Sequence, residues 1–136
     1  MEKKKTSAPK KSISKPGYVD GFLLTVPKKK LAEYKILAQL GCKVWLEHGA
    51  LDYCECAGDD LKIKMGIPFP ALLKLGRNDV VIFSWITYKS RAHRDAVNAK
   101  VMKDPRMNTM GGADKMPFDC NKMSFGGFKV MLSAKN

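Results

Sequence analysis

The chain has 136 residues, of which 45% are hydrophobic and 28% are charged, and this composition is typical of a single globular domain. Its 25 basic and 13 acidic residues give a net charge of +12. No apolar run approaches the roughly 18 residues that a membrane helix needs, and the N-terminal lysines lack the apolar stretch of a secretory signal. The four cysteines form no CxxC pair, which suits a reducing cytosol better than a disulfide scaffold. We therefore expect a cytoplasmic protein without a membrane segment.

Residues 1–16 differ in composition from the rest of the chain. They contain six lysines, one glutamate and two prolines, without an apolar pattern. This composition predicts a disordered basic tail in front of a single domain over residues 17–136. Two interpretations of the tail stay open, because it either binds nucleic acid by counterion release or is an inert solvated extension.

Four strands are predicted from the hydrophobic pattern. Residues 18–26 and 80–88 are apolar on both faces, which is typical of central strands. Residues 51–57 alternate between apolar and polar side chains, and residues 125–132 form a last strand that two glycines open. The connection over residues 58–78 is long, and its leucines predict one short packed turn.

Two helices are predicted between these strands. An apolar stripe at spacings of three and four runs from Leu31 to His48, and Gly49 ends this helix. Ser90 is a good N-cap for a second helix that reaches about Lys103. The loop that follows is rich in methionine, which favours adaptable packing over a cofactor site.

The resulting order, β-α-β-β-α-β, predicts an α+β protein with the ferredoxin-like fold. Right-handed crossovers place the first and third strands in the centre of a four-stranded antiparallel sheet, with both helices on one face. The other face carries one of two apolar sets on the third strand, either Val81, Phe83, Trp85 and Thr87 or Ile82, Ile86 and Tyr88. Both sets are too apolar to stay wet, so we expect a homodimer joined through the open sheet faces.

Four segments carry a resemblance to a known family, namely YVDGFLLTVPKKKL, KVWLEHGALDYCEC, VIFSWITYKSRAHRDAVNAKVM and MPFDCNKMSFGGF. They cover most of residues 18–132 and resemble the small bacterial YbaA-like family, a domain of unknown function. The resemblance implies the dimeric α+β barrel superfamily, in which two ferredoxin-like sheets pack face to face. Relatives in that superfamily include cofactor-free monooxygenases, isomerases, YciI-like proteins and haem-dependent chlorite dismutases, and the resemblance itself implies no particular activity.

Asp20 and His48 occupy positions with apolar surroundings. Asp20 lies on an apolar strand face, where its carboxylate must pair, hydrogen-bond or stay protonated, and such groups serve as general bases. The alternative is that Asp20 reaches water or a turn amide near the strand end. His48 ends the apolar stripe of the first helix, where it either handles protons or acts as a cap that the helix dipole stabilises.

His93 is the first candidate catalytic residue, ahead of Asp20 and His48. A helical wheel points it toward the apolar side, and the helix N-terminus favours its neutral ring, which can act as a general base. The alternative is a core histidine bonded to a carbonyl. The polar side of the wheel carries Arg91, Arg94, Asp95 and Asn98. Arg91 or Arg94 is a candidate for holding an anionic ligand by a forked hydrogen bond.

Ser84, Trp85 and Tyr88 on the third strand are further candidate ligand-binding residues. Ser84 and Tyr88 share one face and Trp85 takes the other, although bulky residues on a central strand are also typical of a core. Cys54 and Cys56 share a strand face, but a zinc signature needs four well-spaced ligands, so no metal site is predicted. No glycine-rich phosphate loop is present, and no cofactor is predicted.

Three classes of function stay open. The first is an enzyme or binder of a small molecule, with a pocket between sheet and helices, and the sequence does not decide between catalysis and binding. The second is an RNA- or DNA-binding module that uses the lysines at 3–5, 10–11 and 28–30, although the chain has no RNP-like aromatic motif. The third is a structural or regulatory dimer.

Overall fold

The computed structural model describes residues 15–136, apart from the side chain of Ala113, and forms an α+β fold with a four-stranded antiparallel sheet. The predicted basic tail therefore lies almost wholly outside the described residues. The sheet has the order β2-β3-β1-β4, built from strands β1 (Tyr18–Pro27), β2 (Asp52–Ala57), β3 (Asp79–Tyr88) and β4 (Ser124–Lys129). The two strands that are apolar on both faces lie in the centre, which confirms the predicted ferredoxin-like arrangement.

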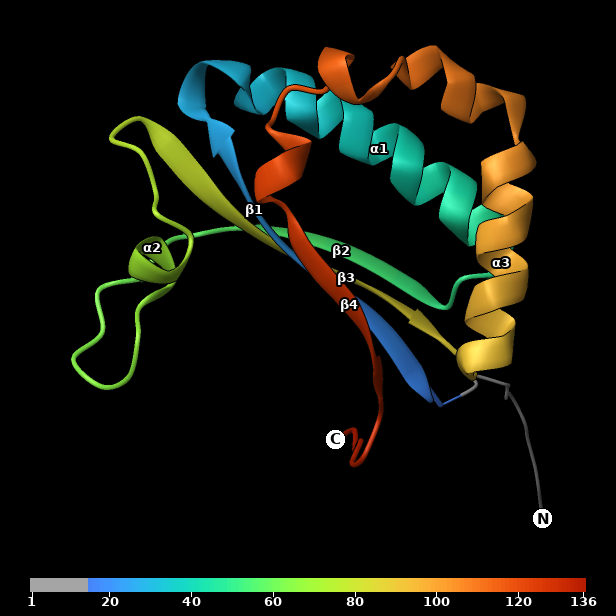
Figure 1. Ribbon diagram of the computed structural model, residues 1–136. Coiled ribbons are helices and arrows are strands. Elements are labelled where there is room, and N and C mark those ends of the chain that lie inside the picture. The colour runs from blue at the N-terminus through green and yellow to red at the C-terminus, as the bar shows by residue number, and fades with distance from the viewer. Residues whose placement is uncertain (1–14) are drawn as a thin grey trace.

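Helices α1 (Leu31–Glu47) and α3 (Arg91–Lys103) cover one face of the sheet (Figure 1). Gly49 follows α1 at a φ of 116°, and the Ala50 N–H donates to the Trp45 carbonyl at 3.0 Å, which closes the helix end. Ser90 caps α3 as predicted, since its hydroxyl accepts from the His93 N–H at 3.1 Å. Within the described part of the chain, no helix combines the length and the apolar character needed to span a bilayer.

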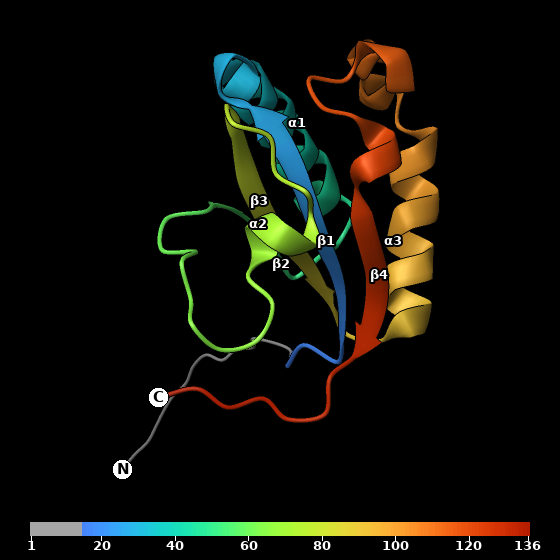
Figure 2. The same cartoon turned by 60° about the vertical axis from the view of Figure 1, so that its left-hand side comes forward.

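The helix-facing side of β3 carries Ile82, Ile86 and Tyr88, which are buried in the core. The alternation along the strand places Phe83 and Trp85 on the opposite face, where the side chain of Phe83 is 47% exposed. The short helix α2 (Phe69–Leu72) and its connecting loop lie on that side of the sheet (Figures 1 and 2). The sheet is therefore covered by α1 and α3 on one face and only in part on the other.

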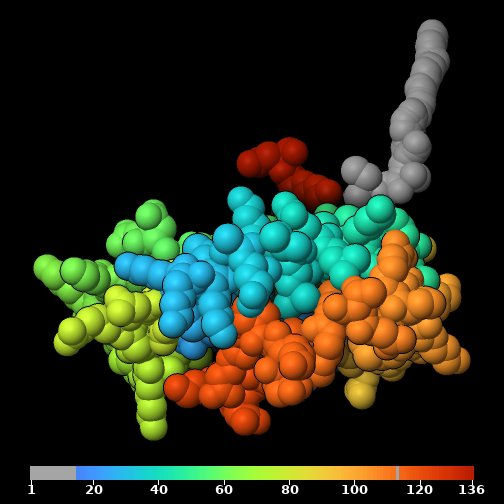
Figure 3. Space-filling view, turned by 90° about the horizontal axis from the view of Figure 1, so that it is seen from above, coloured from blue at the N-terminus to red at the C-terminus, as the bar shows by residue number. Residues whose placement is uncertain are grey.

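Residues 105–123 complete the cover of the helix-facing side. They contain three 3-10 turns, Pro105–Met110, Ala113–Lys115 and Cys120–Lys122, and lie beside α1 (Figure 3). β4 follows and ends at Lys129, so the prediction of a strand to residue 132 is wrong at that end. Lys129 pairs with Tyr18, the first residue of β1, and the Val130 N–H still donates to the Gly17 carbonyl at 3.1 Å before the chain leaves the sheet.

Candidate functional site

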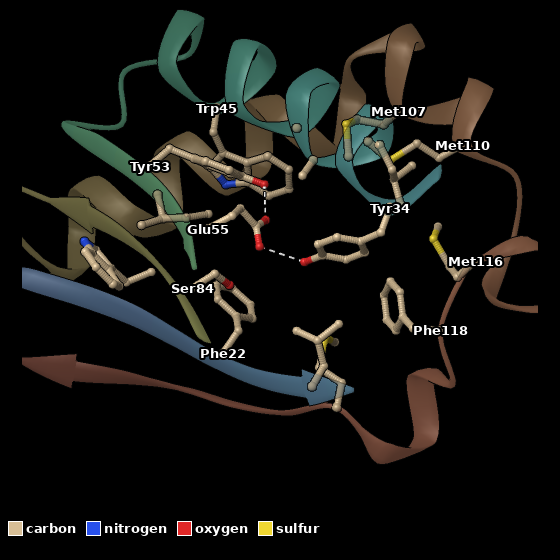
Figure 4. Close-up of a pocket in the computed structure, with 17 residues that line it drawn as sticks. Phe22, Tyr34, Trp45, Tyr53, Glu55, Ser84, Met107, Met110, Met116 and Phe118 are labelled. Atoms are coloured by element: carbon tan, nitrogen blue, oxygen red, sulfur yellow. Dashed lines mark hydrogen bonds between the residues drawn. The ribbon is translucent and has the colours of Figure 1, made fainter. Parts of the chain in front are cut away.

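A cavity of about 220 Å³ lies between the sheet, α1 and the segment 105–123 (Figure 4). Its walls are mostly apolar, and they include the rings of Phe22, Tyr34, Trp45, Tyr53 and Phe118 and four methionines of the segment 105–123. The volume exceeds the roughly 150 Å³ of an engineered apolar cavity that binds benzene. The cavity is therefore large enough for a substituted aromatic ring.

The Glu55 carboxylate is the polar centre of this cavity. Glu55 lies on β2, opposite Ser84 of β3. The Tyr34 hydroxyl of α1 donates to Glu55 Oε1 at 2.7 Å, and the Tyr53 hydroxyl, two residues earlier on the same strand face, donates to Glu55 Oε2 at 2.9 Å. The three side chains converge from α1 and β2 (Figure 4). They form a hydrogen-bonded cluster, which we call the Glu55 triad.

Burial and the Glu55 charge raise the pKa of Tyr34 and of Tyr53 well above the usual range for tyrosine. Both hydroxyl groups therefore stay protonated at neutral pH and act as hydrogen-bond donors to Glu55. Each Glu55 oxygen accepts one of these bonds and keeps a further lone pair. The arrangement leaves the carboxylate able to accept a further hydrogen bond from a ligand.

A second polar cluster surrounds Asp20 on β1. Its side chain is only 8% exposed, and Arg94 of α3 donates to it from Nη1 at 2.5 Å. Burial raises the pKa of Asp20, and the nearby Arg94 guanidinium opposes that rise. Asn98 lies beside the pair and accepts from Trp45 Nε1 at 3.0 Å and from the Tyr88 hydroxyl at 3.3 Å.

A cavity of about 220 Å³ borders Asp20, Arg94 and Asn98. It shares Phe22, Trp45 and Ile86 with the cavity of the Glu55 triad, so the two cavities adjoin. The polar side of the predicted helical wheel thus divides, because Arg94 and Asn98 line this cavity while Arg91 and Asp95 are exposed. The buried carboxylate of Asp20 requires a counter-charge, which draws this side of α3 toward the sheet.

His93 lies outside the residues that line these cavities. Its Nδ1 accepts from the Lys89 N–H at 2.9 Å, its ring meets the Tyr88 ring edge-on at 6.0 Å, and its Nε2 faces Gly49. Burial and the charges of two lysines lower the pKa of His93, which favours the neutral ring. The half-buried position agrees with the predicted orientation, and each contact joins α3 to neighbouring chain segments.

His48 contacts Asp104 rather than a cavity. Its Nε2 lies 2.8 Å from Asp104 Oδ2, and Arg106 donates to the same carboxylate at 2.7 Å. The hydrogen bond from Arg106 lowers the pKa of Asp104 most, and the hydrogen bond with His48 lowers it further. Arg106 also pairs with Glu47 at 2.9 Å, so this cluster ties the end of α1 to the end of α3. The structure thus places His48 at a junction between helices.

The remaining candidate ligand-binding residues do not lie together in one site. Ser84 lines the inner cavity, while Tyr88 contributes to the Asp20 cluster. Trp85 borders the same cavity, but its ring contacts Phe83 on the open face at 5.4 Å between centroids. Arg91 is exposed on α3, and Asp95 pairs with Arg94 at 2.8 Å.

The two cysteines of β2 lie close together on the open face, with their Sγ atoms 3.7 Å apart. Burial and the neighbouring thiol raise the pKa of Cys54. Among the described residues, no group of three or more His, Cys, Asp or Glu side chains is placed to hold a metal ion. Of the three lysine clusters, only residues 28–30 fall in the described part of the chain, where they form an exposed 3-10 turn.

Sequence reasoning missed the Glu55 triad. Two signals were present, since Tyr53 and Glu55 alternate onto the helix-facing side of β2, and Tyr34 lies on the apolar stripe of α1. A carboxylate on the inner face of an edge strand was the sign that a buried polar cluster exists there. The contribution of Met107, Met110, Met116 and Met123 to the wall was predicted only as loop packing.

Comparison with known proteins places the chain in a family. Residues 17–120 match the family described as "Protein of unknown function (DUF1428)". The chain belongs to this family. It is 40% identical over 115 residues to "Uncharacterized protein YbaA" of Escherichia coli (strain K12), which covers 85% of this chain and 97% of the relative. The protein of the same name from Shigella flexneri matches to the same extent, so the relatives are bacterial and the predicted resemblance is confirmed.

Proposed function

We propose that this member of the DUF1428 family binds a small, largely apolar molecule in the cavity of the Glu55 triad. The observation that carries the proposal is a carboxylate held by Tyr34 and Tyr53 inside an otherwise apolar cavity of about 220 Å³. Apolar walls with a few convergent polar groups are typical of small-molecule sites. The polar centre would orient the ligand, while the aromatic and methionine side chains would supply most of the contact area.

We also propose that the binding unit is a homodimer joined through the open sheet faces. The support is the apolar character of that face, where Phe83 is 47% exposed and Phe128 is 62% exposed. Exposed apolar side chains also occur outside the sheet, since Leu72 of α2 is 56% exposed and Leu132 after β4 is 89% exposed. A second copy would cover a surface that is costly to leave in water.

A set of monosubstituted benzenes tests the binding proposal in the full chain. We expect toluene, benzyl alcohol or benzylamine to shift the amide NMR signals of residues that line the cavity. Ala38 of α1 lines the cavity, so Ala38→Leu fills it and should abolish these shifts while the chain stays folded. Ala32→Leu on the exposed side of the same helix is the matched control and should leave the shifts unchanged.

The proposal is refuted when no probe shifts these signals at millimolar concentration. It is also refuted when Ala38→Leu binds the probes as well as the native chain does.

The Asp20 cluster supports a second candidate, a cofactor-free enzyme that moves a proton. A buried carboxyl group with a raised pKa beside a cavity has the character of a general acid or base. For this candidate, Asp20→Asn should abolish turnover of any substrate found while ligand binding persists. Equal turnover by the native chain and the variant would exclude Asp20 as the proton-transferring group.

A further inference from the structure

We infer that the ligand of the inner cavity is a protonated amine on an apolar body, bound through the Glu55 carboxylate. This inference rests on the proposed function, because it names the class of ligand for the same cavity. Among the described residues that line the cavity, Glu55 alone carries a charge. Its hydrogen-bond partners Tyr34 and Tyr53 are neutral donors, and among the described residues no cation forms an ion pair with the Glu55 carboxylate.

Glu55 is half-buried, so its carboxylate is partly removed from water, and an opposite charge beside it would offset that cost. An ammonium group would supply that compensation, and its three N–H donors match the lone pairs that the two carboxylate oxygens keep. A ligand carboxylate or phosphate would instead meet a like charge in an apolar cavity. The negative charge of Glu55 therefore favours a cationic ligand, although the whole chain has a net charge of +12.

The walls of the cavity favour the same class of ligand. The rings of Phe22, Trp45 and Phe118 line the cavity together with the two tyrosines of the Glu55 triad. Aromatic faces attract ammonium groups, and this attraction grows when both partners are removed from water. The methionines of the segment 105–123 form the remaining wall, and their flexible thioether side chains can adapt to an apolar body.

An outer groove gives the amine a route to Glu55. A groove of about 410 Å³ runs between α1 and the edge strand β2, and it is lined in part by Lys35, Gln39 and Cys42. The groove and the inner cavity share Ala38 and the three residues of the Glu55 triad. The triad is thus the wall between the two spaces. A ligand that arrives at the edge of the sheet meets the carboxylate before it reaches the apolar interior.

Three probes of similar shape test this inference by calorimetry on the full chain. Benzylamine carries a charged donor, benzyl alcohol a neutral donor, and toluene no donor. We expect the native chain to bind benzylamine on the order of tenfold more tightly than benzyl alcohol or toluene. Glu55→Gln keeps the size of the side chain and removes its charge, so it should lower the affinity for benzylamine to that of toluene measured on the same variant.

Three other results are possible, and each contradicts the amine inference. Equal binding of all three probes by the native chain overturns the amine inference and leaves the binding function standing. A preference for benzylamine that survives Glu55→Gln also overturns the inference. When no probe binds, both proposals fail.

Tyr53→Phe is the second variant, for use if Glu55→Gln does not fold. It removes one donor and frees an acceptor site on Glu55, so the ratio of benzylamine affinity to toluene affinity, both measured on the variant, should rise severalfold. A ratio that does not rise in this variant would overturn the inference.

Discussion

Gly41 of α1 makes room for the Tyr53 hydroxyl, because a Cβ atom at position 41 would lie 2.9 Å from that oxygen. A glycine inside a helix costs about 1 kcal/mol relative to alanine, and Gly41 is buried in the interior of a 17-residue helix. The helix therefore carries a residue that weakens it at the point where a strand side chain needs space. The consequence is that Tyr53 can reach Glu55.

Gly41→Ala should gain little or no stability, although alanine is the better helix former. The added methyl group pushes the Tyr53 hydroxyl away from Glu55, and the lost hydrogen bond to a charged group offsets the helix gain of about 1 kcal/mol. Urea denaturation of the native chain and the variant measures this difference in the free energy of unfolding.

The Tyr53→Phe background supplies the control for this prediction. With the hydroxyl group absent, Gly41→Ala meets no close oxygen, so it should stabilise the chain by about 1 kcal/mol. Equal stabilisation by alanine in both backgrounds would show that Gly41 has no relation to Tyr53.

Arg94→Met should destabilise the protein by about 3 kcal/mol at pH 7, because it leaves the Asp20 carboxylate buried without its cation. The loss depends on pH. The pKa of Asp20 is already raised in the folded state, and it rises further without Arg94. A raised pKa favours folding below about pH 4 and loses that contribution as the pH increases through the folded value. The loss in the free energy of unfolding caused by Arg94→Met should therefore be largest at neutral pH and smallest near pH 4.

Arg91→Met is the matched control on the same helix, since Arg91 is exposed. It should change the free energy of unfolding by less than about 0.5 kcal/mol at either pH. Denaturation curves at pH 4 and pH 7 that show the same deficit for Arg94→Met would contradict the assignment of the effect to Asp20.

His93→Ala should cost about 1 kcal/mol at pH 8, because it removes the acceptor of the exposed Lys89 N–H and the contact with Tyr88. The pKa of His93 is lowered, so the folded state disfavours protonation of the ring. The stability that the residue contributes is complete above pH 6.5 and decreases as the pH falls below that value. The difference between native chain and variant should therefore shrink at pH 5.5.

Ligand binding gives a second readout for His93→Ala. His93 does not line the cavities described above, so affinity for the benzene probes should stay within twofold of the native value. A folded, stable variant that has lost ligand binding would instead favour the hypothesis that His93 belongs to the functional site.

Phe83→Asp should convert the protein from a dimer to a monomer, since it places an unpaired charge on the apolar open face. Light scattering at micromolar concentration measures the change in mass. Ile36→Asp is the control, because Ile36 is 69% exposed on α1, which covers the other face of the sheet. A native chain that is monomeric at these concentrations would contradict the proposed dimer.

The fold could be predicted because its signals are local. Each element is marked by a signal that spans only a few residues: strand alternation, the apolar stripe of α1, the Ser90 cap and the Gly49 stop. The order of these elements along the chain then predicts a ferredoxin-like sheet. Asp20 could be singled out by the same local argument. The pairing of Asp20 with Arg94 could not, because the two residues are 74 positions apart.

The inner cavity was harder to predict for a related reason. Its polar centre joins Tyr34 and Glu55, which are 21 positions apart on different elements. One of its walls is the segment 105–123, whose short turns have no hydrophobic period to reveal which side chains point inward. The candidate histidines were visible as residue types, but the structure places both at junctions between segments.

The two tryptophans lie on opposite faces of the sheet, with Trp45 against both cavities and Trp85 beside Phe83 on the open face. Because the chain contains no other tryptophan, replacing either one leaves a single indole emission to follow. In a Trp85→Phe variant the remaining emission comes from Trp45 and follows occupancy of the cavities. In a Trp45→Phe variant it comes from Trp85, whose ring contacts Phe83 on the open face but which also borders the inner cavity. The fold thus contains two optical reporters, and a ligand in the inner cavity can change the emission of both.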